Sequence, residues 1–195
     1  MDSKDEKEEP PFDGPPPFEI ERDATHIARW EAAEEGAELL REGEIDLAIA
    51  ELKKVIEKDS QNEYACFFLG AAYFEKGDFE RALKAYYEAL RIAPRYLGAL
   101  VGAGHCLRLL GKHDQAIRVG KEVLLQRKED PDALYLLALT YLAKGERSQS
   151  KEYLKRFLAT NPELEVAKEA EGLIAILEGR IDGVLPDPPK PFGSS

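Results

Sequence analysis

Five glycines recur along the chain at a constant interval of 34 residues. They are Gly43, Gly77, Gly111, Gly145 and Gly179. No insertion or deletion separates the copies. A globular domain built around one central core has no reason to keep such a period, whereas a stack of identical supersecondary units does. The spacing therefore predicts a repeat architecture.

Apolar residues recur every three or four positions from about Asp23 onward, which is typical of amphipathic helices. The pattern predicts helices over residues 24–42, 46–58, 63–76, 79–92, 97–110, 113–127, 132–144, 147–160 and 163–178. Each spaced glycine follows the first helix of a pair, where a residue with a permissive backbone ends a helix before a turn. We expect the chain to fold into antiparallel helix pairs.

Small residues recur at two further positions of the 34-residue unit. With the spaced glycine at the fifteenth position, units begin at 29, 63, 97 and 131. The eighth position holds Gly36, Gly70, Gly104 and Ala138, and the twentieth holds Ala48, Ala82, Ala116 and Ser150. Small side chains at both places let the two helices of a pair approach closely.

This combination resembles the tetratricopeptide repeat, whose pattern has small residues at positions eight and twenty, aromatic residues near eleven and twenty-four, and proline at thirty-two. The second copy matches best, at Leu69, Gly70, Tyr73, Gly77, Asp78, Phe79, Ala82, Tyr86, Ala89 and Pro94. Other copies depart from it: the fourth position lacks the frequent tryptophan, and Ser60 and Lys128 replace the proline. The resemblance implies an all-α, right-handed α-solenoid of about four helix pairs plus a C-terminal capping helix.

The chain divides into three parts by composition. Residues 1–22 are acidic and proline-rich, residues 23–179 carry the repeats, and residues 180–195 are again proline-rich. Within the repeats the expected units are 29–62, 63–96, 97–130 and 131–164, with a cap over 165–179. Proline-rich, charged tails are expected to be extended or disordered. Phe12, Phe18 and Phe192 follow prolines, so the tails are either inert or dock in an apolar groove.

The charge balance limits the class of partner. Lys and Arg number 27 against 38 Asp and Glu, for a net charge of −11. This argues against nucleic acid, which needs a basic face, and against an anionic membrane surface. No apolar run is long enough to predict membrane insertion, and MDSKDEKEEPP lacks a secretory signal. Cys66 and Cys106 lie in helical patterns and are expected to be buried free thiols, so we expect a cytoplasmic protein.

The resemblance implies that the first helices of successive repeats line a concave groove. The expected partner-binding residues are Tyr64, Phe67, Phe68, Ala71, Phe74, Gly98, Val101, Gly102, His105, Tyr135, Leu136 and Leu139; Arg108 also occupies a groove position. Phe67 and Phe68 exceed the packing needs of the repeat, and apolar surface of this kind marks interaction sites. Gly98 and Gly102 predict a trough between an aromatic and an aliphatic wall, with room for an apolar peptide or helix.

Two more specific functions find no support in the residues. A carboxylate clamp, which grips chaperone C-termini in some resembling proteins, needs lysine and asparagine where this chain has Ala33 and Ala37, and a frame shifted by one repeat keeps none of the clamp residues. GAGHCL at 102–107 begins like a dinucleotide fingerprint but lacks its third glycine and lies mid-helix. His105 and Cys106 point about 100° apart on a helix and do not converge on a metal.

We therefore expect a non-enzymatic scaffold or adaptor without cofactor or metal, which binds an apolar peptide or amphipathic helix of another protein. One alternative is a dedicated substrate chaperone resembling the small tetratricopeptide chaperones of type III secretion. A second is self-association, in which a proline–phenylalanine tail occupies the groove of its own or a neighbouring molecule.

Overall fold

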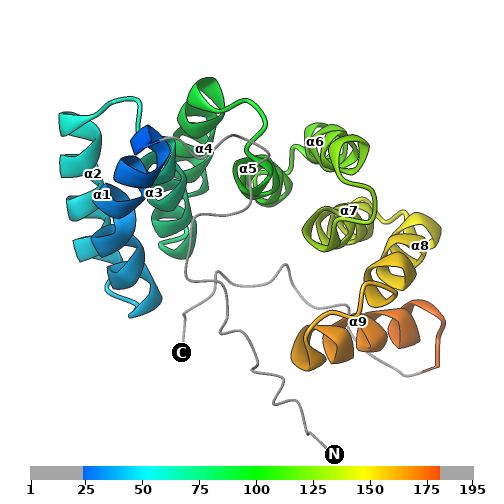
Figure 1. The fold of residues 1–195 in the computed structure, drawn as a ribbon. Coiled ribbons are helices and arrows are strands. Elements are labelled where there is room, and N and C mark those ends of the chain that lie inside the picture. The colour runs from blue at the N-terminus through cyan, green and yellow to red at the C-terminus, as the bar shows by residue number, and fades with distance from the viewer. Residues whose placement is uncertain (1–23, 181–195) are drawn as a thin grey trace, which may run out of the picture.

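The computed structural model describes residues 24–180, which form nine helices and no strand (Figure 1). They are α1 (Ala24–Arg41), α2 (Ile45–Lys58), α3 (Glu63–Glu75), α4 (Phe79–Ile92), α5 (Leu97–Leu109), α6 (His113–Gln126), α7 (Pro131–Ala143), α8 (Arg147–Leu158) and α9 (Leu164–Leu177). Every end lies close to its predicted position, so the predicted helices are confirmed. Both tails, with Phe12, Phe18 and Phe192, fall outside the described residues.

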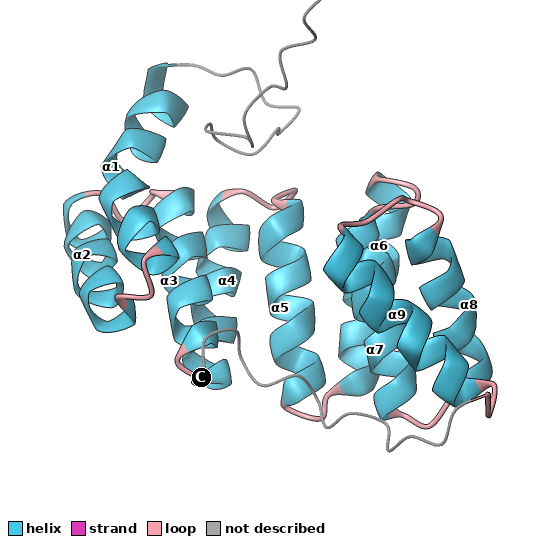
Figure 2. Ribbon diagram, turned by 90° about the horizontal axis from the view of Figure 1, so that it is seen from below, coloured by secondary structure: helices cyan, strands magenta, loops and turns pink. Residues whose placement is uncertain are grey.

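The helices stack into an arch with two rows (Figures 1 and 2). Consecutive helices pack against each other along the whole described chain. The odd-numbered helices also contact one another, α1 with α3, α3 with α5 and α5 with α7, whereas no two even-numbered helices do. The odd-numbered helices therefore form the inner row of the arch and the even-numbered helices the outer row, as expected for an α-solenoid.

The five spaced glycines all have left-handed backbone conformations. Their φ angles are 81°, 79°, 72°, 77° and 68° in chain order. At Gly77, the glycine N–H donates to the carbonyl of Phe74 at 2.9 Å and the Asp78 N–H donates to that of Tyr73 at 2.9 Å. This pair of bonds ends a helix in a Schellman motif. The same pairing recurs at all five turns, because each turn needs a φ that side chains with a Cβ adopt only at a cost.

The small residues at positions eight and twenty lie where the two helices of a pair meet. Ala48, Ala82, Ala116 and Ser150 have no exposed surface. A Cβ on Gly70 would lie 2.8 Å from the ring of Tyr86, closer than packed atoms approach. Gly172 of α9 differs, since a Cβ there would meet no atom within 4 Å. The last helix has no partner after it among the described residues, so its glycine serves no close approach.

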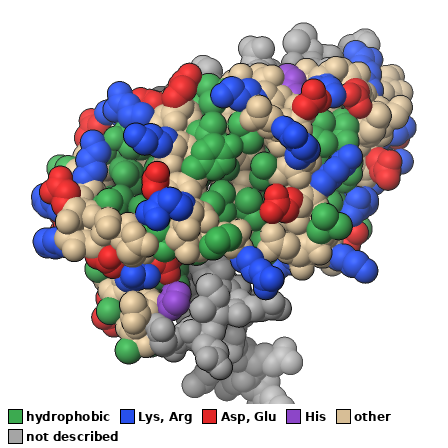
Figure 3. Space-filling view, turned by 90° about the horizontal axis from the view of Figure 1, so that it is seen from above, with side chains coloured by type: hydrophobic (Ala, Val, Ile, Leu, Met, Phe, Trp, Pro, Cys, Tyr) green, Lys and Arg blue, Asp and Glu red, His purple; other side chains and the backbone are tan. Residues whose placement is uncertain are grey.

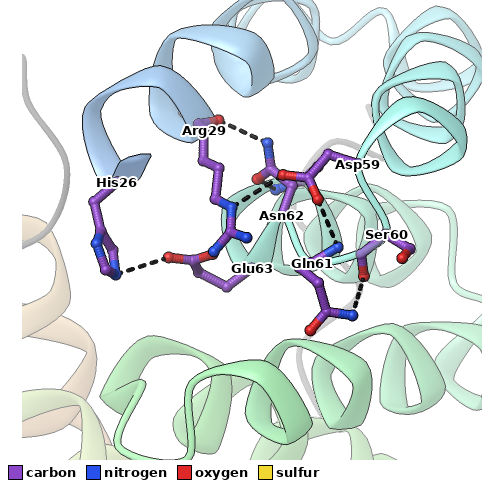
Figure 4. A network of polar contacts seen from close by, with 8 residues as sticks. His26, Arg29, Asp59, Ser60, Gln61, Asn62 and Glu63 are labelled. Carbon is purple, nitrogen blue, oxygen red and sulfur yellow. Dashed lines mark hydrogen bonds and ion pairs between the residues drawn. The ribbon is translucent and has the colours of Figure 1, made fainter. Parts of the chain in front are cut away.

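A polar network fastens α1 to the turn between α2 and α3 (Figure 4). The Arg29 guanidinium donates to Asp59 at 3.0 Å and to Glu63 at 3.3 Å, and His26 lies 3.4 Å from Glu63. The Asn62 amide donates to the Arg29 carbonyl at 2.8 Å and accepts from the N–H of Ala65 at 2.9 Å. Asn62 thus caps α3 and holds α1 with the same side chain.

The inner face of α3, α5 and α7

The inner helices differ from the outer helices in how their apolar residues are distributed. The sequences of α3, α5 and α7 are apolar around nearly the whole helix, whereas α2, α4 and α6 are amphipathic with one charged face. A helix that is apolar all round is normally buried on all sides. Several residues of α3 and α5, and Tyr135 of α7, are nevertheless only half-buried, and we call the side of the inner row that carries them the inner face.

An aromatic cluster begins this face at α3. Phe68 packs edge-on against Trp30 of α1, with ring centroids 5.6 Å apart. Phe67 packs against Phe68 at 5.2 Å and stacks on Tyr96 at 4.7 Å. Tyr64 and Tyr96 are buried, whereas Trp30, Phe67 and Phe68 keep part of their surface exposed. These phenylalanines therefore pack within the protein and also contribute apolar surface.

Aromatic rings fill part of the trough predicted at Gly98 and Gly102. A Cβ on Gly102 would overlap the ring of Tyr86, and one on Gly98 would lie 3.3 Å from the ring of Phe67. The space beside Gly102 is therefore filled by the protein itself, whereas Gly98 is exposed although rings lie close to it. The glycines admit aromatic rings of the preceding repeat, which close the junction between α3, α4 and α5.

The predicted residues of α7 divide between core and surface. Leu136 is fully buried and packs against Gly104, and Leu139 is 6% exposed. Contrary to the prediction, neither residue contributes to the inner face. Tyr135 is half-buried and packs on Phe157 at 4.9 Å. The predicted residues that keep exposed surface are Phe67, Phe68, Ala71, Phe74, Gly98, Val101, Gly102, His105 and Tyr135.

Three ionisable residues, His105 and Arg108 of α5 and Glu75 of α3, lie among these apolar residues, and the repeat pattern did not predict their burial. Arg108 is only 5% exposed. Burial and the Arg108 guanidinium lower the pKa of His105 to about 3, so His105 is neutral at pH 7. Burial raises the pKa of Glu75, at the end of α3, to about 7. A single arginine in the otherwise apolar stretch LGALVGAGHCLRL was the available signal for this polar region.

Figure 3 shows the convex side of the arch, which is opposite to the inner face. Charged side chains of both signs surround bands of apolar ones on this side. Tyr87 of α4 and Leu125 of α6 are 46% and 86% exposed. Single exposed apolar residues are normal on protein surfaces. Within residues 24–180, no helix has the length and hydropathy to cross a bilayer, and no group of acidic, His or Cys side chains has a metal-binding arrangement.

Comparison with known protein families gives two matches. Two sequence profiles described as tetratricopeptide repeat match residues 34–96 and residues 107–174. Together these segments cover most of the arch and leave out only its two ends and the junction around α5.

Curated relatives contain this sequence pattern as a small part of much longer chains. Superkiller complex protein 3 of Homo sapiens is 24% identical over 155 residues, which are 80% of this chain and 10% of that protein. Protein CTR9 homolog of Arabidopsis thaliana is 31% identical over 105 residues, 53% of this chain and 10% of that protein. The chain thus spans about a tenth of these relatives' length.

Solved structures share the fold at low sequence identity. A structure from the functional characterization of Pseudomonas aeruginosa pilF superposes with a TM-score of 0.69 at 22% identity, covering 78% of this chain and 68% of that one. The structure of MamA superposes with a TM-score of 0.64 at 23% identity, covering 74% and 84%. These likenesses show the same solenoid architecture.

Proposed function

Because this chain belongs to the tetratricopeptide repeat family, whose repeats act as protein–protein interaction scaffolds, we propose that its inner face binds an apolar peptide or amphipathic helix of another protein. The face consists of the exposed parts of Phe67, Phe68 and Phe74 on α3, Val101 on α5 and Tyr135 on α7.

One observation carries this proposal. The residues of α3 and α5 that keep exposed surface include Phe67, Phe68, Phe74 and Val101, on helices that are otherwise almost entirely apolar. Keeping apolar side chains in water has a cost of about 25 cal/mol per Å² of apolar surface. The outer helices α4 and α6 each have a charged face and expose one large apolar residue, Tyr87 or Leu125. An apolar side that persists on the inner helices is therefore best explained by a partner that covers it.

The curvature favours an elongated partner over a globular one. The inner helices α3, α5 and α7 follow one another across the arch in Figure 2. Neighbouring packed helices lie about 8–10 Å apart. A segment that crosses three of them is about 20 Å long, which an amphipathic helix spans in about four turns. Recognition would then depend on apolar anchors at helical spacing.

The proposal is tested by selecting ligands and mapping where they bind. A phage library of random 16-residue peptides is enriched on the full chain, and the dissociation constants of the recovered peptides are measured by fluorescence anisotropy. Phe68→Ser, Phe74→Ser and Val101→Ser are combined in an inner-face variant. The control combines Tyr87→Ser and Leu125→Ser, which remove exposed apolar side chains from the outer helices.

We expect the recovered peptides to be rich in apolar residues at helical spacing. Their affinity should fall at least about tenfold in the inner-face variant, since each buried aromatic or aliphatic anchor contributes about 1.5–3 kcal/mol. It should stay unchanged in the outer-face control. Affinity that survives in the inner-face variant, with circular dichroism unchanged, or that is lost only in the control, contradicts the proposal. Failure to enrich any peptide does so too.

A further inference from the structure

Arg108 on α5 is a buried charge that lacks a partner among the described residues. Its side chain is 5% exposed, and its Nε is buried and forms no hydrogen bond. Across residues 24–180, no ion pair or hydrogen bond joins the guanidinium to a carboxylate or carbonyl. By contrast, Arg29, which is only half-buried, pairs with both Asp59 and Glu63. Arg29 thus has two carboxylate partners, whereas Arg108 has none between residues 24 and 180.

This arrangement opposes the stability of the unbound protein. Burying a charge without a partner is strongly unfavourable, which is why breaking a buried ion pair destabilises a protein. Most ionisable groups escape this cost by becoming neutral, but a guanidinium stays protonated in proteins. Burial does lower the pKa of Arg108, and the group still carries its charge near pH 7. An anion brought by a partner would remove this penalty.

The surroundings of Arg108 are polar but carry no compensating negative charge. His105 lies one helical turn earlier on α5 and is neutral. Tyr135 of α7 is close enough to the Arg108 guanidinium to interact with it electrostatically. The phenol of Tyr135 is itself held in its neutral form, because burial and Glu169 of α9 raise its pKa. His105 and Tyr135 are both half-buried, and the Tyr135 hydroxyl itself is buried. A group that reaches Arg108 from the inner face would meet two uncharged polar side chains beside one guanidinium.

We propose that Arg108, flanked by His105 and Tyr135, binds the carboxylate of an aspartate or glutamate side chain within the partner's apolar segment. This inference rests on the proposed function of the inner face. Arg108 lies on the central helix of the apolar side, between the aromatic residues of α3 and Tyr135 of α7. A segment that contacts both neighbours passes over Arg108 with its middle, so an internal side chain is the group that reaches it.

The negative charge of the protein as a whole favours a carboxylate over a phosphate. Glu75, Asp132 and Glu169 lie on the inner helices α3, α7 and α9, and the whole chain carries a net charge of −11. A dianionic phosphate would be repelled about twice as strongly as a monoanionic carboxylate at the same distance. One guanidinium with a planar fork of donors suits one carboxylate.

The test uses peptides recovered by phage selection on the full chain. The tightest peptide that contains an internal Asp or Glu is synthesised with an amidated C-terminus, together with its Gln or Asn counterpart, a phosphoserine counterpart, and the Gln or Asn peptide with a free C-terminal carboxylate. Dissociation constants are measured for the wild type, for Arg108→Met, and for Arg118→Met as a control that removes an exposed arginine of α6.

We expect the acidic peptide to bind the wild type at least about tenfold more tightly than its amide counterpart, as a charged hydrogen bond contributes about 1.5–3 kcal/mol. Arg108→Met should abolish that difference, and Arg118→Met should preserve it. Equal binding of acid and amide peptides, with sensitivity to the inner-face variant retained, overturns this inference and leaves the proposed function standing. Tighter Arg108-dependent binding of the phosphoserine or free-carboxylate peptide also overturns it.

A second measurement needs no ligand. Because Met replaces a buried unpaired charge with an apolar side chain of similar length, Arg108→Met should raise the melting temperature of the unbound protein, while Arg118→Met should leave it nearly unchanged. A clear fall in the melting temperature of Arg108→Met would mean that the guanidinium stabilises the fold itself, and would overturn the proposal.

Discussion

The ring of Tyr96 stacks on the ring of Phe67, with centroids 4.7 Å apart and planes inclined by 30°. Tyr96 is the residue before α5, and it occupies the same place in its repeat as Asn62 before α3 and Asp130 before α7. Those two residues cap their helices through side-chain oxygens, whereas Tyr96 forms no such bond. At the start of α5, the contact between Tyr96 and Phe67 therefore takes the place of a side-chain helix cap.

Tyr96→Asn tests which of the two interactions matters more. The change supplies a capping side chain for α5, a gain of about 1 kcal/mol. It also deletes a buried ring, and truncating a buried aromatic side chain costs about 3–5 kcal/mol. We expect a net loss of about 2–4 kcal/mol in the free energy of unfolding, measured by urea denaturation. A variant as stable as the wild type would show that the stacked pair contributes little.

Asn62→Asp separates the two roles of Asn62. The carboxylate still accepts from the N–H of Ala65, so the cap of α3 persists, but it no longer donates to the Arg29 carbonyl and lies close to buried Glu63. An unsatisfied buried acceptor costs about 1–3 kcal/mol. We expect a loss of that size at neutral pH. Asp130→Asn keeps its cap and serves as the control, with a smaller effect on thermal unfolding.

Two glycines at equivalent repeat positions should respond in opposite ways to alanine. Gly172→Ala adds a methyl group that meets no atom within 4 Å, so it should stabilise the protein by about 0.5–1 kcal/mol through helix propensity. Gly70→Ala forces a methyl group against the ring of Tyr86 and should destabilise by about 1–3 kcal/mol. Differential scanning calorimetry distinguishes the two signs. The same sign for both variants would contradict the assigned packing.

Glu75 should make stability depend on pH between its two pKa values. Burial raises its pKa to about 7 in the folded protein from the ordinary 4.5. Between these values the folded protein retains a proton that the unfolded chain has released, so stability falls as pH rises through this window. Glu75→Gln should remove this loss, and its stability relative to the wild type should increase from pH 4.5 to pH 8. A constant difference across that range would show that Glu75 is not desolvated.

Much of the fold could be predicted because each local signal is repeated. The 34-residue spacing of the glycines located every first-helix end, and all five glycines have the positive φ that such ends require. The positions of Gly70 and Ala82 indicated where two helices meet, and both lie at close contacts. These features depend on backbone geometry and residue size within one unit, so the sequence of one unit determines them.

The inner face could be predicted only in part, because its residues are shared between repeats. Phe67 lies on the predicted side of α3, but the pattern could not show that its ring fills the space beside Gly98. Leu136 occupies a position that lines the surface in resembling proteins, and here it is buried against Gly104 of the preceding repeat. Each outcome depends on the side chains of the neighbouring unit.

The sequence by itself determined the repeat, its helix ends and the apolar character of α3, α5 and α7, because these follow from local spacing and composition. The tertiary structure decided which of those apolar residues remain at the surface, and it buried Arg108 without a counter-charge from any residue of the nine described helices. The reason is that burial and charge pairing are properties of the contact between units, where side chains distant in sequence compete for the same space. The spaced glycines determine the form of each unit, and the packing between units decides which residues a partner can reach.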